Sequence, residues 1–123
     1  MEPIKRPTKP GQWEIVARSV KVGKAWDELS NLWPARCQEI FDILSNTPDY
    51  DDGDRQGRLR GKVSEGTFEG QNFVRWQIDV NGASRVWYFV DATAYGVKQK
   101  KRSGRVIIDQ IYFGHPKQTE QMD

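Results

Sequence analysis

Apolar residues between positions 22 and 44 recur every three or four residues, which is the spacing of a helix face. Pro34 falls inside this pattern, and proline is tolerated in the first turn of a helix but not in its middle. The pattern therefore predicts two helices, over residues 22–32 and 34–45, that form a hairpin or a kinked pair. The apolar positions that define the period are Val22, Trp26, Leu29, Trp33, Cys37, Ile40, Phe41 and Leu44.

Alternating and β-branched segments flank the helices and predict strands. One candidate, residues 13–18, precedes the helices, and four follow them, over residues 58–63, 73–80, 85–90 and 105–113. Asn81 and Gly82 lie between two of these segments and are typical of a tight hairpin turn. The order predicts an α+β fold: an N-terminal strand, a helical hairpin, then a three- to four-stranded antiparallel sheet with the helices on one face.

Period-two alternation assigns side chains to the two faces of that sheet. The helices are expected to cover the face that carries Val74, Trp76, Ile78 and Val80. We assign four large aromatic residues to packing: Trp26, Trp33, Phe41 and Trp76. The opposite face is then polar and basic, with Arg60, Lys62, Arg75, Gln77 and Arg85.

The length of 123 residues is about that of one domain. Residues 1–11 contain three prolines and are interpreted as a flexible arm, residues 12–117 as the single domain, and residues 118–123 as a polar tail. No apolar run approaches the roughly 20 residues that cross a bilayer, and residues 1–7 lack the apolar stretch of a signal peptide. We therefore expect a cytoplasmic protein without a membrane partner.

A single cysteine, Cys37, and a single histidine, His115, exclude an intramolecular disulfide and a standard structural zinc site. We predict no metal and no other cofactor. The net charge is only +2, but the charges are clustered. An acidic cluster occupies residues 49–54, and the densest basic cluster, in the segment 98–105, contains Lys98, Lys100, Lys101 and Arg102. Such a cluster either attracts phosphates or is a solvated loop.

Three segments carry a resemblance to a known family: residues 58–62, residues 83–90 (ASRVWYFV) and residues 111–117 (IYFGHPK). They resemble the RelE/ParE superfamily of toxins from type II toxin–antitoxin systems. The resemblance implies the same fold order, an N-terminal strand, a helical hairpin and an antiparallel sheet. RelE-like and HigB-like members cut messenger RNA on the ribosome, whereas ParE-like members act on DNA gyrase. The expected partners are therefore a cognate antitoxin, the ribosome and messenger RNA.

RNA cleavage without a metal uses the 2′-hydroxyl as nucleophile, cations that stabilise the charged phosphate, and a group that transfers protons near neutral pH. His115 is the candidate general acid or base because histidine titrates in that range. Arg85 falls where the family has its phosphate-binding arginine. Arg60 and Lys62, two positions apart on one predicted strand, are expected to hold a phosphate together. These four residues are the predicted catalytic set.

Aromatic and basic residues around that set are candidates for RNA binding, because bases stack on aromatic rings and phosphates attract cations. Trp87 and Tyr112 are alternatively core residues, Arg85 a partner of Asp79, and His115 a plain turn residue. The candidates are Arg75, Trp87, Tyr112, Lys117, Lys98, Lys100, Lys101 and Arg102, with Glu65 as a weaker candidate base. The sequence predicts an endoribonuclease toxin that inhibits translation. The alternatives are a module of the same fold that acts on a protein such as gyrase, and a generic RNA-binding domain.

Overall fold

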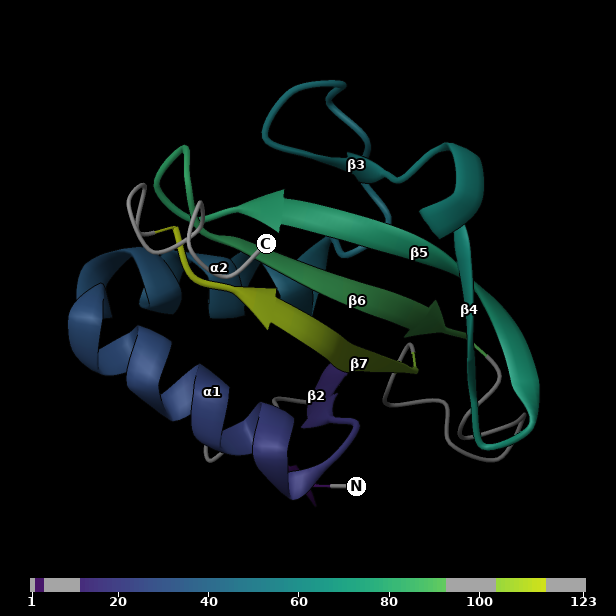
Figure 1. Cartoon of the computed structure of the whole chain (residues 1–123), viewed down its shortest axis with the longest axis horizontal. Helices are drawn as coiled ribbons and strands as arrows, with labels where there is room; N and C mark the ends of the chain where they lie inside the picture. Colours follow the sequence, from purple (N-terminus) through teal and green to yellow (C-terminus); the bar gives the residue numbers. More distant parts are fainter. Residues whose placement is uncertain (1, 4–11, 93–103, 115–123) are drawn as a thin grey trace.

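The computed structural model describes residues 2–3, 12–92 and 104–114 of the chain (Figure 1). The two predicted helices are confirmed as α1 (Val20–Leu32) and α2 (Pro34–Asn46). The Ser19 hydroxyl caps α1 by accepting the Val22 N–H at 3.2 Å. Trp33 joins the helices in a non-helical conformation and is 44% exposed, so its assignment to packing is wrong. The helical period does not apply to a residue that belongs to neither helix.

Seven strands in the described part of the chain form one sheet. The path β1-β2-β7-β6-β5-β3 is joined by β4, which pairs with β5. Because β2 runs parallel to β7, the sheet is mixed, and the expected three- to four-stranded antiparallel sheet is wrong in both strand number and direction. The strands are β1 (Glu2–Pro3), β2 (Glu14–Ala17), β3 (Gln56–Arg58), β4 (Glu65–Phe68), β5 (Gln71–Asp79), β6 (Arg85–Asp91) and β7 (Arg105–Tyr112).

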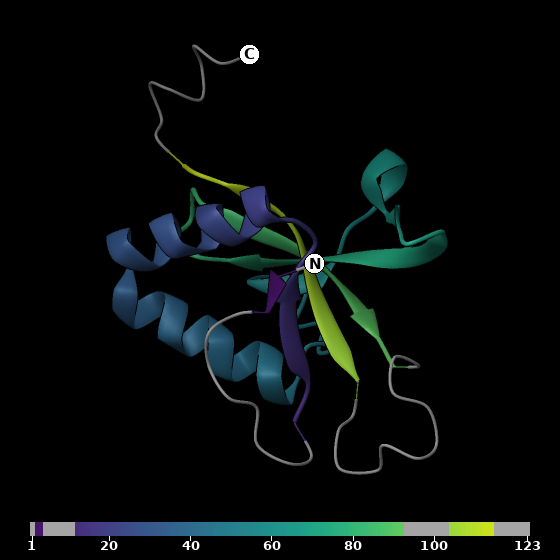
Figure 2. The ribbon, with the colours of Figure 1, turned by 90° about the horizontal axis from the view of Figure 1, so that it is seen from below.

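Both helices cover the same face of the sheet, as predicted (Figure 2). The main core lies between them, where Leu29 and Ile40 from the helices meet Tyr88 and Ile108 from the sheet, all four fully buried. Trp26, Phe41 and Trp76 belong to this core, as the sequence predicts. The helices do not cover the other face of the sheet, which we call the far face.

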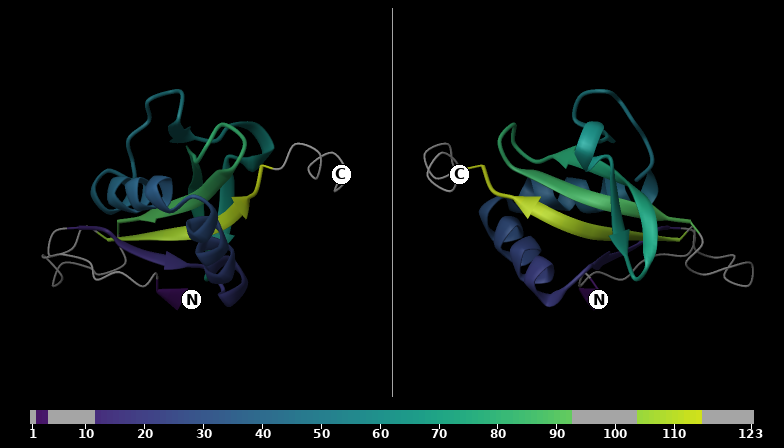
Figure 3. Two further views of the ribbon diagram at one scale, coloured as in Figure 1. Left: turned by 90° about the vertical axis from the view of Figure 1, so that its left-hand side faces the viewer. Right: turned by 45° about the vertical axis from the view of Figure 1, so that its right-hand side comes forward.

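The β4–β5 hairpin lies over the far face of the sheet (Figures 1 and 3), and a second, smaller core lies beneath it. It consists of Phe68, Phe89, Ile107 and Val16, with Phe73 packed against it. The first half of β5 pairs with β4 and lies beyond the helices (Figure 2). Val74 lies on the same side of β5 as Trp76, as the alternation predicts, but it is 47% exposed, so the expected cover by the helices is wrong at this position.

The predicted strand over residues 58–63 is also wrong. Strand β3 ends at Arg58, and residues Gly61–Val63 form the short 3-10 helix η1. Gly61 has a φ of +72°, which glycine adopts readily and which ends an extended run. Lys62 therefore lies in η1 and Arg60 in the loop before it, rather than together on one strand.

The hairpin turn at residues 80–84 lies where the sequence predicts it. Asn81 accepts the backbone N–H groups of Ala83 and Ser84 on its side-chain oxygen, at 3.0 and 2.6 Å. Gly82 has a φ of +88°, the conformation for which glycine is suited. In the described part of the chain, no helix is long and apolar enough to cross a membrane.

Candidate functional site

A β-bulge in β7 determines which residues reach the far face. Trp87 on β6 pairs with Gln110, but the next residue, Tyr88, pairs with Ile108, so Asp109 has no partner across the ladder. The extra residue reverses the alternation of β7 beyond it. Gln110 and Tyr112 therefore lie on the far face, beside Trp87.

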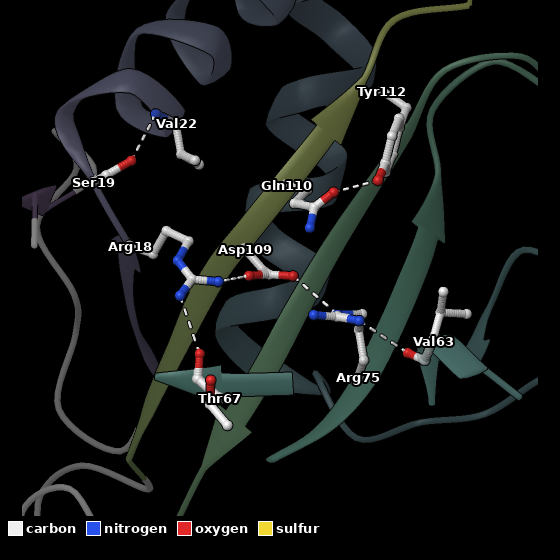
Figure 4. A network of polar contacts seen from close by, with 9 residues as sticks. All are labelled: Arg18, Ser19, Val22, Val63, Thr67, Arg75, Asp109, Gln110 and Tyr112. Carbon is white, nitrogen blue, oxygen red and sulfur yellow. Dashed lines mark hydrogen bonds and ion pairs between the residues drawn. The ribbon is translucent and has the colours of Figure 1, made fainter. Parts of the chain in front are cut away.

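The rings of Trp87 and Tyr112 form an aromatic shelf on this face, and Gln77 lies beside Trp87. The Trp87 indole N–H donates to Gln77 Oε1 at 2.9 Å. The rings of Trp87 and Tyr112 meet edge to face, with centroids 4.8 Å apart, and the Tyr112 hydroxyl donates to Gln110 (Figure 4). Tyr112 is 41% exposed and Trp87 is half-buried, so the shelf offers ring surface to a ligand.

Arg85 lies at the end of the shelf, opposite Tyr112 on one neighbouring strand and Asp79 on the other. The Asp79 carboxylate accepts the Gly82 N–H at 2.9 Å and pairs with Arg55 at 3.7 Å. Among the residues that the structure describes, Arg85 is exposed and forms no ion pair. It lines an open hollow of about 520 Å³ with Asp54, Arg55, Gln77, Asp79, Asn81 and Gly82.

The end of the described chain is fixed beside Arg85. The Gly114 N–H donates to the Ser84 hydroxyl at 2.8 Å, and Ser84 is buried. A side chain at Gly114 would meet the Cβ of Ala83 at 2.2 Å, so only glycine allows this approach. Gly114, which precedes His115 in the sequence, is thus hydrogen-bonded to Ser84, which precedes Arg85.

Arg75 also lies on the far face, but its guanidinium, unlike that of Arg85, is engaged by other groups in the described part of the protein. Its Nε donates to Asp109 at 2.9 Å and its Nη1 to the Val63 carbonyl at 3.2 Å (Figure 4). Its side chain is only 12% exposed, and its guanidinium carbon lies 5.3 Å from the Trp87 ring centroid. Arg75 supports Trp87 through a cation–π contact.

The structure does not bring Arg60 and Lys62 to Arg85. Leu59 bonds to Arg75 of β5, whereas Arg85 pairs with Asp79. The four residue steps along β5 from Arg75 to Asp79 span about 13 Å. Arg60 instead lines a separate open hollow of about 360 Å³ with Asp51, Arg58, Leu59, Ser64, Glu65 and Val74.

Other predicted residues lie outside the described residues: His115, Lys117, Lys98, Lys100, Lys101 and Arg102. Sequence reasoning missed Asp109 and Gln110, and it placed Gln77 on the polar face without a role. The signal was two consecutive polar residues inside an apolar strand, because strict alternation cannot accommodate both and a bulge can.

Fold and site together define an α+β protein whose mixed sheet carries helices on one face and a cationic, aromatic shelf on the other. No protein-family model, curated protein or solved structure matches this chain. Function is therefore inferred from the site itself and from the motifs in the sequence.

Proposed function

We propose that this chain is the toxin of a type II toxin–antitoxin system, of the RelE-like or HigB-like kind, and that it cleaves messenger RNA on the ribosome without a metal. A cognate antitoxin protein would neutralise it. The single observation that carries the proposal is the exposed Arg85, without an ion pair to any described residue, at the end of the Trp87–Tyr112 shelf, with Gly114 hydrogen-bonded to the neighbouring Ser84.

These groups suit a phosphodiester with exposed bases. Trp87 and Tyr112 provide rings on which an unpaired base stacks, a sequence-tolerant contact worth about 1–3 kcal/mol per base. The Arg85 guanidinium provides a cation for a phosphate that accumulates negative charge. His115, the next residue after Gly114, is the proposed proton-transfer group, as general acid or general base.

The remaining basic residues have a supporting part in this proposal. Arg60 and Lys62 are exposed, and they attract RNA without binding the phosphate that Arg85 binds. Lys117 and the segment containing Lys98, Lys100, Lys101 and Arg102 add to this attraction on the ribosome. The predicted catalytic set is therefore reduced, in the proposal, to Arg85 and His115.

Expression of the chain from an inducible promoter in bacteria tests this function. Growth and incorporation of labelled methionine should stop, and 5′-end mapping should reveal new ends inside coding regions. Arg85→Ala and His115→Ala should each restore growth and remove the new ends. Arg58→Ala is the matched control, because Arg58 is an exposed arginine paired with Asp51 at 3.5 Å, away from the shelf.

Undiminished cleavage in both Arg85→Ala and His115→Ala would refute the proposed site. Growth arrest without new RNA ends would instead indicate a module that acts on a protein such as gyrase. RNA binding without growth arrest would indicate a generic RNA-binding domain.

A further inference from the structure

We propose that Asp109 is a positioning residue for the shelf: through Arg75 it sets the orientation of the Trp87 ring. The RNA-binding consequence of this inference rests on the function proposed above. The coupling from Asp109 to Trp87 stands on contacts within the protein and can be tested without RNA.

The first step is that Asp109, the extra residue of the bulge, is buried. The carboxylate has no exposed surface, and each of its oxygens is paired: Oδ1 with Arg18 of the segment after β2, and Oδ2 with Arg75 of β5 (Figure 4). A buried carboxylate is retained only with such partners, because an unpaired charge is costly to remove from water. Asp109 therefore fixes the position of both guanidinium groups.

The second step is that the Arg75 guanidinium is held from several sides. Asp109 holds Nε, and the Val63 carbonyl holds Nη1. The backbone of β4 closes against Nη2, since a Cβ placed on Gly66 would lie 2.3 Å from that nitrogen. A guanidinium fixed in this way has one orientation to present to its neighbours.

The third step is the contact between Arg75 and the aromatic rings. Its guanidinium carbon lies 5.3 Å from the Trp87 ring centroid and 5.6 Å from that of Phe89. The Trp87 indole N–H donates to Gln77, so Gln77 holds the edge of the ring and Arg75 contacts its face. A ring ordered before RNA arrives loses less conformational freedom on binding, and this increases affinity.

Arg18 is a built-in control for this inference. It pairs with the same carboxylate, but the other described contacts of its side chain are the Thr67 carbonyl at 3.0 Å and the Phe68 ring at 5.7 Å. Arg18 and Arg75 thus share Asp109 and carry the same charge, and in the described contacts only Arg75 reaches Trp87. A purely structural role for Asp109 predicts similar effects from losing either arginine.

The first experiment compares Arg75→Gln with Arg18→Gln in the full chain labelled with fluorotryptophan. ¹⁹F NMR resolves the tryptophan signals, and Trp87→Phe identifies the one from Trp87. We expect Arg75→Gln and Asp109→Asn to shift or broaden the Trp87 signal and Arg18→Gln to leave it in place. An unmoved Trp87 signal in Asp109→Asn or in Arg75→Gln, or equal shifts in both arginine variants, would overturn the inference.

The second experiment measures the direction in which Asp109→Asn changes the affinity for RNA, because charge and positioning predict opposite directions. Asp109→Asn removes a negative charge, which by itself would tighten RNA binding. Positioning predicts the reverse: anisotropy with a labelled, uncleavable 2′-O-methyl oligoribonucleotide should reveal binding weakened about tenfold, in the range of one lost base–aromatic stack. Asp91→Asn is the matched control, because Asp91 is a buried acid paired with Arg105 on the same face. It should bind RNA as well as the wild type, or more tightly.

If Asp109→Asn does not fold, the comparison of Arg75→Gln with Arg18→Gln in the same binding assay replaces it, because each loses one positive charge. Weakening confined to Arg75→Gln supports the inference, and equal weakening overturns it. A wild-type chain that binds no RNA and cuts none would refute the proposed function, whereas the ¹⁹F comparison would still decide whether Asp109 orients Trp87.

Discussion

Tyr88 and Tyr112 carry the same hydroxyl in opposite surroundings. Tyr88 is fully buried; its hydroxyl donates to the Pro48 carbonyl at 2.7 Å and accepts from Gln56 Nε2 at 3.0 Å. Burial raises the pKa of the Tyr88 phenol, so it stays protonated and continues to donate. Tyr112 is 41% exposed and belongs to the shelf. The first tyrosine serves the fold and the second serves the proposed site.

Replacing each of the two tyrosines by phenylalanine separates these roles. Tyr88→Phe should lower the free energy of unfolding by about 1 kcal/mol, because a buried hydrogen-bonded hydroxyl is lost. Tyr112→Phe should leave it nearly unchanged, because Tyr112 is exposed and water can replace the hydrogen bond between its hydroxyl and Gln110. Urea unfolding followed by circular dichroism measures both, and equal losses would contradict the assignment.

At the scale of elements, the acidic loop 49–54 caps the free edge of β3. Asp52 accepts the Gln56 N–H at 3.0 Å, and Asp51 accepts the Arg58 N–H at 3.2 Å. Each carboxylate also accepts a backbone N–H inside the loop. The caps satisfy donors that an edge strand otherwise presents to another chain. Capping of this sheet edge therefore accounts for Asp51 and Asp52 of the acidic cluster.

These hydrogen bonds predict a pH dependence of stability. The backbone N–H groups, chiefly those of Arg58 for Asp51 and of Gln56 for Asp52, hold the pKa of both carboxylates below the usual 3.8. A lowered pKa in the folded state contributes stability above pH 3.8 that is lost as the pH falls through the folded value. Asp51→Asn/Asp52→Asn should be less stable at neutral pH and should lose less stability on acidification. Urea midpoints between pH 6 and pH 3 decide this; parallel slopes for variant and wild type would argue against the caps.

At the scale of the whole molecule, a net charge of +2 means that attraction to RNA must be local. Arg85→Ala should therefore weaken RNA binding and reduce the slope of log K against log salt concentration by about 0.7, the value for one phosphate contact on a single strand. Trp87→Ala should weaken binding at every salt concentration with the slope unchanged, because stacking releases no counterions. Identical slopes for Arg85→Ala and the wild type would remove Arg85 from the phosphate.

The sequence predicts those parts of the molecule in which one period continues without interruption. Trp26, Leu29 and Ile40 mark two helices whose observed ends lie within two residues of the expected ones. Single residues that change the backbone direction do not follow from the period itself. Gly61 turns an alternating segment into a 3-10 helix, and Asp109 reverses the faces of β7. The shelf depends on that reversal, so it became visible only in three dimensions.

The parallel pairing joins β2, which is synthesised early, to β7, which is synthesised much later. Arg18 and Asp109, which meet at this pairing, are 91 positions apart. Since β7 lies between β2 and β6, a growing chain lacks the middle of its sheet until the last strand emerges. Pairings this distant in sequence form slowly, because a long loop must close first. The nascent protein therefore passes through a stage in which the residues of both helices have been synthesised but the surface that would hold RNA has not yet formed.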